Sequence, residues 1–225
     1  MVVSRSGWAR CPGCATICPG LHTTVAAFDV DGTITLRDST TAFCLATVPM
    51  RRLAPALAWR APWLAAHQLG LADRTALKES LLTALFGGME EGRLAAAAAD
   101  WATAELPGLV RPSALARVRW HQSRGHRVVL ASASLDLLVR PWARTIGIDD
   151  VLATRLESRG GLITGRLDGA NCYGAEKVAR LRALVGDLDG LELYAYGDSR
   201  GDRELLAAAR HPAYRPFHRA VSSDR

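Results

Sequence analysis

Short apolar runs alternate with longer segments of mixed polarity along most of the chain. Five of these runs have the length and β-branched content of buried strands. They are residues 24–30, 127–131, 151–156, 162–167 and 191–196. The segments between and after them favour helices at 38–48, 113–124, 135–146, 175–185 and 203–209. This alternation predicts an α/β fold built on a doubly wound parallel sheet, with helices on both faces.

One long stretch, residues 49–108, interrupts the alternation because it has helical character and no strand signal. Its first part, 53–71, is rich in Ala, Leu and Trp and is broken by Pro55 and Pro62, and two further helices are expected at 74–86 and 90–105. We therefore expect a helical cap at 49–108, inserted after the first strand. The core would comprise 23–48 and 109–225, preceded by an irregular extension at 1–22.

The composition is that of an ordinary globular protein and narrows the function classes. The net charge is +6, but the basic residues are scattered, which favours anionic small molecules or surfaces as partners and argues against nucleic acid. Of the 28 basic residues only Lys78 and Lys177 are lysine. The five cysteines are unevenly spread and predict no disulfide framework, so a reducing compartment, the cytoplasm, is expected. No signal peptide or membrane span is predicted.

Two carboxylates close the first predicted strand. In an open α/β sheet, ligands bind beyond the carboxyl ends of the strands, so these residues are candidates for chemistry. Asp29 and Asp31 alternate and share a face in extended geometry, while Gly32 permits a sharp turn. Neighbouring carboxylates repel unless a cation lies between them or one is protonated. Both solutions suit phosphoryl transfer, with Asp29 as nucleophile and Asp31 as general acid and base.

Four other polar residues occur in order along the same alternation. Asp198 and Asp202 would complete, with Asp29 and Asp31, an all-oxygen site of the kind that Mg²⁺ prefers. Ser132 would donate a hydrogen bond to the transferred phosphoryl group, and Lys177 would supply positive charge. Taken singly, each residue has an ordinary interpretation as a turn, loop, cap or solvated position. Their joint order favours the functional interpretation.

These residues carry a family resemblance. The segment Phe28-Asp29-Val30-Asp31-Gly32-Thr33 resembles the first motif of the haloacid dehalogenase-like phosphatase superfamily. Ser132, Lys177 and the segment 197–202 match the second, third and fourth motifs in the same order. The resemblance implies a Mg²⁺-dependent phosphomonoester hydrolase that forms an aspartyl-phosphate on Asp29 and acts on a small phosphorylated metabolite. A dehalogenase is disfavoured, because that chemistry does not use Asp31 as a proton donor.

The position of the cap narrows the resemblance to one branch of the superfamily. A helical insertion directly after the first motif is similar to the cap of phosphoserine-phosphatase-like enzymes. Segments around Ser132, Lys177 and Asp198 are closer to a subgroup that contains phosphatidylglycerophosphatase C-like proteins. The chain departs from phosphoserine phosphatases at Gly201, where they usually carry Asn, and in having Asp38 rather than Glu after the first motif. Serine phosphate is therefore not the expected substrate.

Three alternatives stay open beside the small-metabolite phosphatase. One is a lipid phosphate phosphatase at the membrane surface, and another is a phosphotransferase that uses the same aspartyl-phosphate. The third is a non-catalytic regulatory protein that keeps the fold. Hydrolysis products from a broad panel of phosphate esters would separate them.

The most apolar part of the cap, residues 48–71, bears on the membrane alternative. Trp59 and Trp63 are interleaved there with Arg51, Arg52 and Arg60, a combination typical of interfacial segments that contact anionic lipid. Packing within a helical hairpin accounts for the same composition, and for the other tryptophans of the chain. The sequence therefore leaves two interpretations: a buried cap face, or a surface that touches the membrane from the cytoplasmic side.

The extension contains Cys11, Cys14 and Cys18, with His22 nearby. This spacing lacks the second cysteine pair that makes a zinc site convincing. We expect an irregular extension without metal, and removal of residues 1–22 should leave folding and activity intact.

Overall fold

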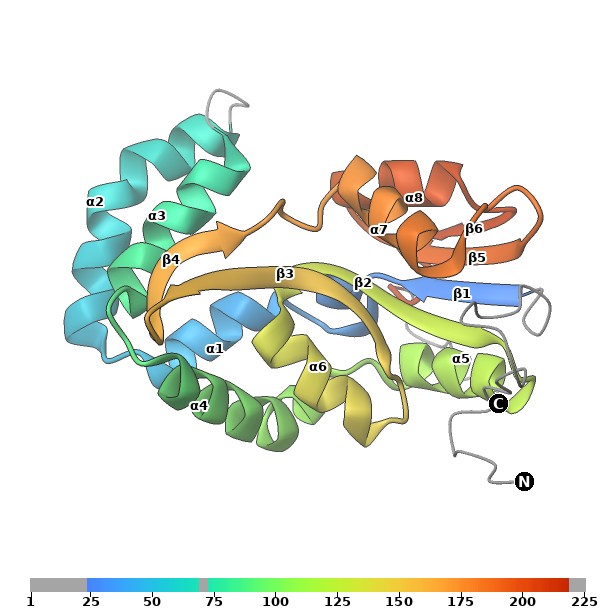
Figure 1. Cartoon of the computed structure of the whole chain (residues 1–225), viewed down its shortest axis with the longest axis horizontal. Helices are drawn as coiled ribbons and strands as arrows, with labels where there is room; N and C mark the ends of the chain where they lie inside the picture. Colours follow the sequence, from blue (N-terminus) through green and yellow to red (C-terminus); the bar gives the residue numbers. More distant parts are fainter. Residues whose placement is uncertain (1–23, 69–72, 219–225) are drawn as a thin grey trace, which may run out of the picture.

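A six-stranded sheet forms the centre of the molecule in the computed structural model, which describes residues 24–68 and 73–218 (Figure 1). The strand order is β4-β3-β2-β1-β5-β6. The strands are β1 Thr24–Phe28, β2 Arg127–Leu135, β3 Asp150–Arg159, β4 Leu162–Asp168, β5 Glu192–Gly197 and β6 His211–Tyr214. Every neighbouring pair is parallel except β3 with β4, which form an antiparallel hairpin. The predicted α/β class is confirmed.

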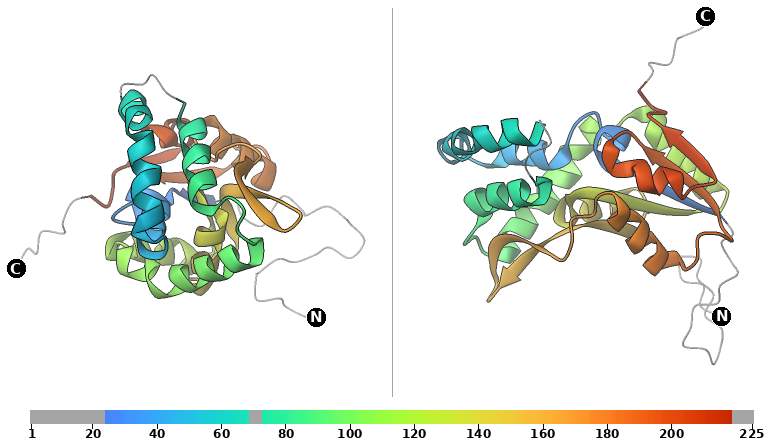
Figure 2. Two further views of the ribbon diagram at one scale, coloured as in Figure 1. Left: turned by 90° about the vertical axis from the view of Figure 1, so that its left-hand side faces the viewer. Right: turned by 90° about the horizontal axis from the view of Figure 1, so that it is seen from above.

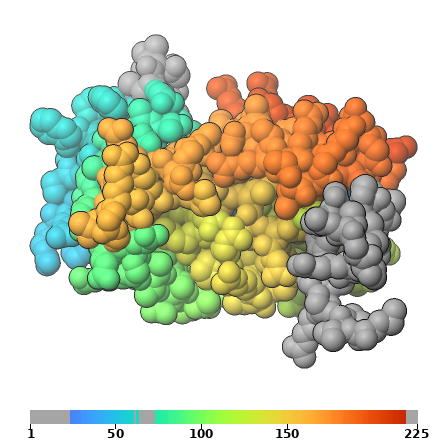
Figure 3. Space-filling view, in the orientation of Figure 1, coloured from blue at the N-terminus to red at the C-terminus, as the bar shows by residue number. Residues whose placement is uncertain are grey.

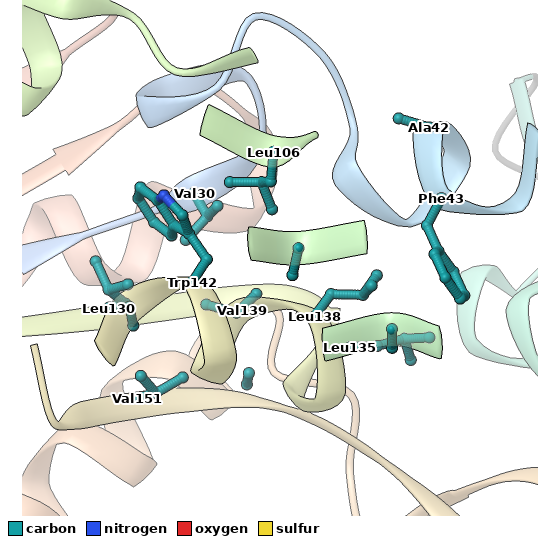
Figure 4. Close-up of a cluster of buried hydrophobic side chains, with 14 of the residues drawn as sticks. Val30, Ala42, Phe43, Leu106, Leu130, Leu135, Leu138, Val139, Trp142 and Val151 are labelled. Carbon is teal, nitrogen blue, oxygen red and sulfur yellow. The ribbon is translucent and has the colours of Figure 1, made fainter. Parts of the chain in front are cut away.

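Helices cover both faces of this sheet because β1 is apolar on both sides. The helices of the core are α1 Ser39–Thr47, α5 Pro112–Ser123, α6 Asp136–Thr145, α7 Ala175–Val185 and α8 Arg203–Ala207. Ala26 and Phe28 join a buried cluster with α5 and α6, whereas Val25 and Ala27 join one with α7 and α8. Figure 4 shows part of the first cluster, where Trp142 of α6 fills the space beside the sheet. Alternation along a buried strand thus explains the two-sided packing.

In the described residues, three α-helices lie between α1 and α5, and we refer to them as the cap: α2 Met50–Gln68, α3 Arg74–Phe86 and α4 Glu91–Ala104. They gather at one end of the molecule (Figure 2). Pro55 and Pro62 lie inside α2, so the expectation that they break this segment is wrong. Each proline removes one backbone donor, to the carbonyl of Arg51 or Ala58. All four residues are exposed, so water can satisfy those carbonyls and the helix continues.

The β3–β4 hairpin extends beyond the sheet and joins the cap. The backbone of Ile163 exchanges hydrogen bonds with the loop after α3, donating to Met89 O (2.8 Å) and accepting from Gly88 N (2.9 Å). At Gly165, a Cβ atom would lie 2.2 Å from the Cα of Thr83, so only glycine permits this close approach of hairpin and helix. The hairpin therefore fixes α3 relative to the sheet.

Two strands differ from the sequence prediction. β2 continues to Leu135, so Ser132 lies within the strand rather than after it. β6 was not predicted, because His211–Tyr214 contains a proline and mostly exposed side chains and so lacks a buried-strand pattern. It forms an edge, where proline is tolerated. The N-terminal extension with its cysteines lies outside the described residues.

The described helices include none with the length and hydropathy that crossing a bilayer requires.

Candidate active site

The carboxyl end of β1 carries Asp29, which is followed by a tight turn over residues 30–34. Gly32 in this turn has φ +81°, a conformation that glycine adopts without strain. A Cβ atom at this position would also lie 2.4 Å from Oδ2 of Asp198. The turn thus brings the loops after β1 and β5 together, which requires glycine for both its conformation and its size.

Lys177 lies between two carboxylates in the interior. Its Nζ donates to Oδ1 of Asp29 and to Oδ1 of Asp202, each at 2.6 Å. The lysine is 2% exposed and both acids are buried. The lysine comes from the first turn of α7, whereas the acids follow β1 and β5. A lysine in a helix is ordinarily solvated, but Lys177 is not, because the fold encloses its ammonium group between the two acids.

Burial and charge act against each other in this group. Burial raises the pKa of Asp29 to about 7, although Lys177 opposes that shift. Burial also opposes ionisation of Asp202, but Lys177 and the hydrogen bonds from Ser199 outweigh it and lower the pKa of that carboxyl. For Lys177, burial disfavours the ammonium, yet the two acids raise its pKa. Asp202 and Lys177 are therefore a stable ion pair, whereas Asp29 needs further positive charge to be fully ionised.

Asp31 is held by the start of α1 and by β2. Its Oδ1 accepts a hydrogen bond from Ser39 N at 2.9 Å, and its Oδ2 accepts a short one from the hydroxyl of Ser134. Burial, together with nearby Asp38, raises its pKa to about 6. A carboxyl group with such a pKa exchanges its proton near neutral pH, as a general acid and base must.

The carboxylates of Asp29, Asp198 and Asp202 can each place one oxygen within 4.8 Å of the others. Hard oxygen ligands and a desolvated Asp29 suit Mg²⁺. Asp202, however, already accepts from Lys177 and, through Oδ2, from Asp198 N, Ser199 N and the Ser199 hydroxyl. Asp29 and Asp198 are therefore the side chains best placed to hold the ion, with Asp202 fixing the loop around them.

The Asp31 carboxylate lies outside this group of three, and its role as a side-chain metal ligand stays a prediction. Its two oxygens are instead engaged by Ser39 at the start of α1 and by Ser134 of β2.

Ser132 is fully buried in β2 and lines a cavity together with Asp29 and Asp31. Its oxygen accepts a hydrogen bond from Ser134 N at 3.0 Å. Within the described part of the chain its hydroxyl proton has no recorded acceptor, so it remains available to an oxygen in the cavity.

Two adjoining cavities open at the carboxyl ends of the strands. The first, of about 210 Å³, is lined by Asp29, Asp31, Ser132, Lys177 and Asp198, so it collects the predicted site residues apart from Asp202 behind it. The second, of about 290 Å³, lies between the sheet and cap helices α2 and α3. Asp38, Arg74 and Ala133 line both cavities, which makes them neighbours. A larger cavity of about 900 Å³ beside β5 and β6 has no carboxylate in its lining.

The sequence analysis did not identify Lys78, a residue of the cap that lines the second cavity. Lys78 of α3 reaches across the second cavity and donates to Ala133 O and to Oδ1 of Asn171, the latter at 3.2 Å. Burial lowers its pKa to about 8. An ammonium has three donors, so one remains for a ligand. Lys78 is one of only two lysines in an arginine-rich chain, and that rarity was the signal that could have found it.

Comparison with known proteins shows the family of this chain. A model described as haloacid dehalogenase-like hydrolase matches residues 26–207. The chain belongs to this family. The match starts in β1 and ends in α8, so it includes the cap and every predicted site residue. The prediction of the haloacid dehalogenase-like superfamily and of a hydrolase is confirmed.

Relatives cover most of the chain. Protein CicA of Caulobacter vibrioides is 37% identical over 206 residues, which are 86% of this chain and 86% of that protein. A probable phosphatase of Mycobacterium tuberculosis is 29% identical over 194 residues, 84% of this chain and 67% of that one. A solved Bordetella pertussis protein of unknown function has TM-score 0.71 at 27% identity, covering 85% and 89%. A phosphoserine phosphatase with a phospho-aspartyl intermediate analogue has TM-score 0.56 at 16% identity, covering 84% of each chain, and so shares the fold.

Proposed function

We propose that this haloacid dehalogenase-like protein is a Mg²⁺-dependent phosphomonoesterase that acts through an aspartyl-phosphate on Asp29. The observation that carries the proposal is the single small cavity that joins a buried carboxylate, its lysine partner and a second carboxyl of raised pKa. The probable phosphatase among the relatives supports it. Asp29 and Asp198 would hold the ion, which supplies positive charge that offsets repulsion between carboxylate and phosphate.

The residues of the chain divide the chemistry between them. An oxygen of Asp29 attacks phosphorus and the bond to the leaving oxygen breaks, while Asp31 gives that oxygen its proton. Water then attacks the phosphorus of the aspartyl-phosphate and passes a proton to Asp31, which releases inorganic phosphate and restores both carboxyls. Ser132 and Lys177 would donate to the phosphoryl oxygens, and Lys177 also keeps Asp29 in place.

The leaving group would occupy the second cavity, where the substrate is selected. Its volume of about 290 Å³ suits a small phosphorylated metabolite, and its lining combines Leu77 and Leu81 with Arg74 and Lys78. With Arg60, three cations line this cavity, and its one acid is the exposed Asp38. This charge balance favours an alcohol that carries a second anionic group. The two described cysteines, Cys44 and Cys172, are buried and free, which fits the proposed cytoplasmic location.

A panel of phosphate monoesters, assayed with Mg²⁺ and with EDTA, tests the reaction class. We expect Mg²⁺-dependent release of inorganic phosphate, and Asp29→Asn should abolish it. The matched control is Asp187→Asn, an exposed acid outside both cavities, which should retain full activity. Hydroxylamine-sensitive labelling by a ³²P-ester should appear in the wild type and not in Asp29→Asn, after deamidation is excluded by mass spectrometry.

The same assays separate the alternatives. Transfer of label to an added alcohol in place of water would identify a phosphotransferase. Absence of turnover with every ester, in a folded protein, would contradict an enzymatic role.

A further inference from the structure

Helix α2 presents an apolar surface to solvent. Between Met50 and Trp63 its only polar side chains are Arg51, Arg52 and Arg60. Trp59 is 85% exposed, Met50 66% and Trp63 53%. Surface helices normally place charged and polar residues on the outer face, and helices that are apolar all round are normally buried. The outer face of α2 therefore lacks the composition of a surface made only for water.

Packing within the cap does not account for this face. Among the side chains of α2 that the structure describes, Leu53 and Ala56 are buried and belong to the hydrophobic core. Arg60 also turns inward, where Nε donates to the Ser80 hydroxyl at 2.9 Å and Nη2 to Ser80 O at 2.6 Å. The expectation that tryptophans serve packing holds for Trp101 and Trp142, which are buried, and fails for Trp59 and Trp63.

The outer face has a regular arrangement. Arg52, Pro55, Trp59 and Trp63 are spaced by three or four residues, so they lie along one side of the helix. Arg51 lies next to this stripe. No ion pair or hydrogen bond is recorded for the side chains of Arg51 and Arg52 among the described residues. We call Arg51, Arg52, Pro55, Trp59, Pro62 and Trp63 the tryptophan face.

The helix is also placed for contact with a flat partner. α2 forms the outer margin of the cap, at the end of the molecule opposite β5 and β6 (Figures 1 and 2). The space-filling view shows it at the edge of the molecule, beyond α3 and the β3–β4 hairpin (Figure 3). An extended surface could therefore approach α2 without first meeting the sheet.

We propose that the tryptophan face docks the protein on an anionic lipid bilayer. Indole rings settle at the depth of the lipid headgroups, and arginines beside them meet lipid phosphates. The helix has no acidic residue that would repel an anionic surface, and the net charge of the chain is +6. With three arginines the helix lies in the interface rather than spanning the membrane.

A second copy of the chain fits this face less well. A symmetric dimer places the same patch against itself, so Arg51 and Arg52 would face their own copies with no acid in the patch to pair with them. The charge pattern favours a negatively charged partner instead. This inference is independent of the proposed reaction, because no residue of the tryptophan face lines either cavity of the active site.

Co-sedimentation with vesicles tests the inference on the full chain. Wild-type protein should bind vesicles of phosphatidylcholine with about one third phosphatidylglycerol, bind pure phosphatidylcholine weakly, and dissociate in high salt. Arg51→Gln with Arg52→Gln should weaken binding roughly 30-fold, since each arginine near an anionic surface contributes about fivefold. Trp59→Ala with Trp63→Ala should weaken it at least tenfold.

Matched controls separate the face from general surface properties. Tyr214→Ala removes an exposed aromatic ring on β6, and Arg119→Gln with Arg203→Gln removes two exposed charges elsewhere. These variants should bind like the wild type, and thermal unfolding should show that all variants are folded. The inference is overturned if the wild type stays in the supernatant, if it binds neutral vesicles equally, or if the tryptophan pair has no effect. Dimerisation through the face in place of vesicle binding would also overturn it.

Discussion

Lys177 is the cation on which the buried charges of the site depend, and its replacement by methionine tests that arrangement. The substitution keeps a side chain of similar length and removes the ammonium. Asp29 and Asp202, each 2.6 Å from Nζ, then face one another without a cation between them. Removing one partner from a buried ion pair leaves an uncompensated charge, which is the costly case.

The expected loss is about 3–5 kcal/mol in the free energy of unfolding, measured without Mg²⁺. A domain of this size is stabilised by roughly 5–15 kcal/mol, so the variant should still fold. Its melting temperature should fall by roughly 6–20 °C. Hydrolysis should fall by about 10²–10³-fold, because Asp29 loses its partner and the phosphoryl oxygens lose a donor.

The pH dependence of this loss has a definite sign. Burial already raises the pKa of Asp29 to about 7, and removing Lys177, which opposes that shift, moves it higher. A carboxyl whose pKa is raised in the folded state loses stability as pH rises from its unfolded value of about 4 toward its folded value. The deficit of the variant relative to wild type should therefore be larger at pH 8 than at pH 5.

Urea unfolding in EDTA at these two pH values measures the effect. The informative control is Lys177→Met combined with Asp202→Asn, which removes one of the two stranded charges and should recover part of the lost stability. A loss below about 1 kcal/mol in the single variant, or no recovery in the double variant, would refute the buried charge arrangement.

Four further outcomes are expected. Asp31→Asn should lower turnover by about 10²–10⁴-fold, most strongly for esters with poor leaving groups, and a good leaving group such as p-nitrophenol should partly rescue it. Lys78→Met should raise KM for an ester with a second anion more than kcat falls. In the wild type that KM should rise as pH passes about 8, where Lys78 loses its proton, and in the variant it should stay flat. Gly32→Ala should cost at least ten-fold in activity, because its Cβ would displace Asp198, as metal titration would show. Lys177→Arg should lower activity at least tenfold in a folded protein, since a planar fork replaces a compact ammonium between two close acids.

Much of the candidate site could be predicted because its residues lie at or near the carboxyl ends of strands. Asp29, Ser132 and Asp198 occur where apolar β runs meet polar residues, and parallel strands bring such positions to one edge. Lys177 required a different signal, its rarity among arginines. The division of labour between Asp198 and Asp202 was not predictable, because it depends on which oxygens the 198–199 backbone and Lys177 engage.

The cap side was harder to predict for physical reasons. A helical sequence without a motif does not show where each side chain points. The contact of Lys78 with the carbonyl of Ala133 in β2 therefore depends on tertiary packing alone. The hairpin that fixes α3 is recognisable only as two short strands. Its role depends on the contact between Gly165 and Thr83, residues 82 positions apart by number. Helix α2 likewise continues through Pro55 and Pro62 because both prolines lie on its exposed side, which the sequence alone does not show.

Gly201, where phosphoserine phosphatases usually carry asparagine, is linked through Tyr173 to Arg74 of the cap. A Cβ atom at Gly201 would lie 2.3 Å from Cε2 of Tyr173, so an asparagine there is incompatible with the ring in its present place. That ring in turn lies under the guanidinium of Arg74, at 4.7 Å from its centroid, and Arg74 lines both cavities. Glycine at position 201 therefore leaves room for the ring of Tyr173, and this ring contacts Arg74 of the cap.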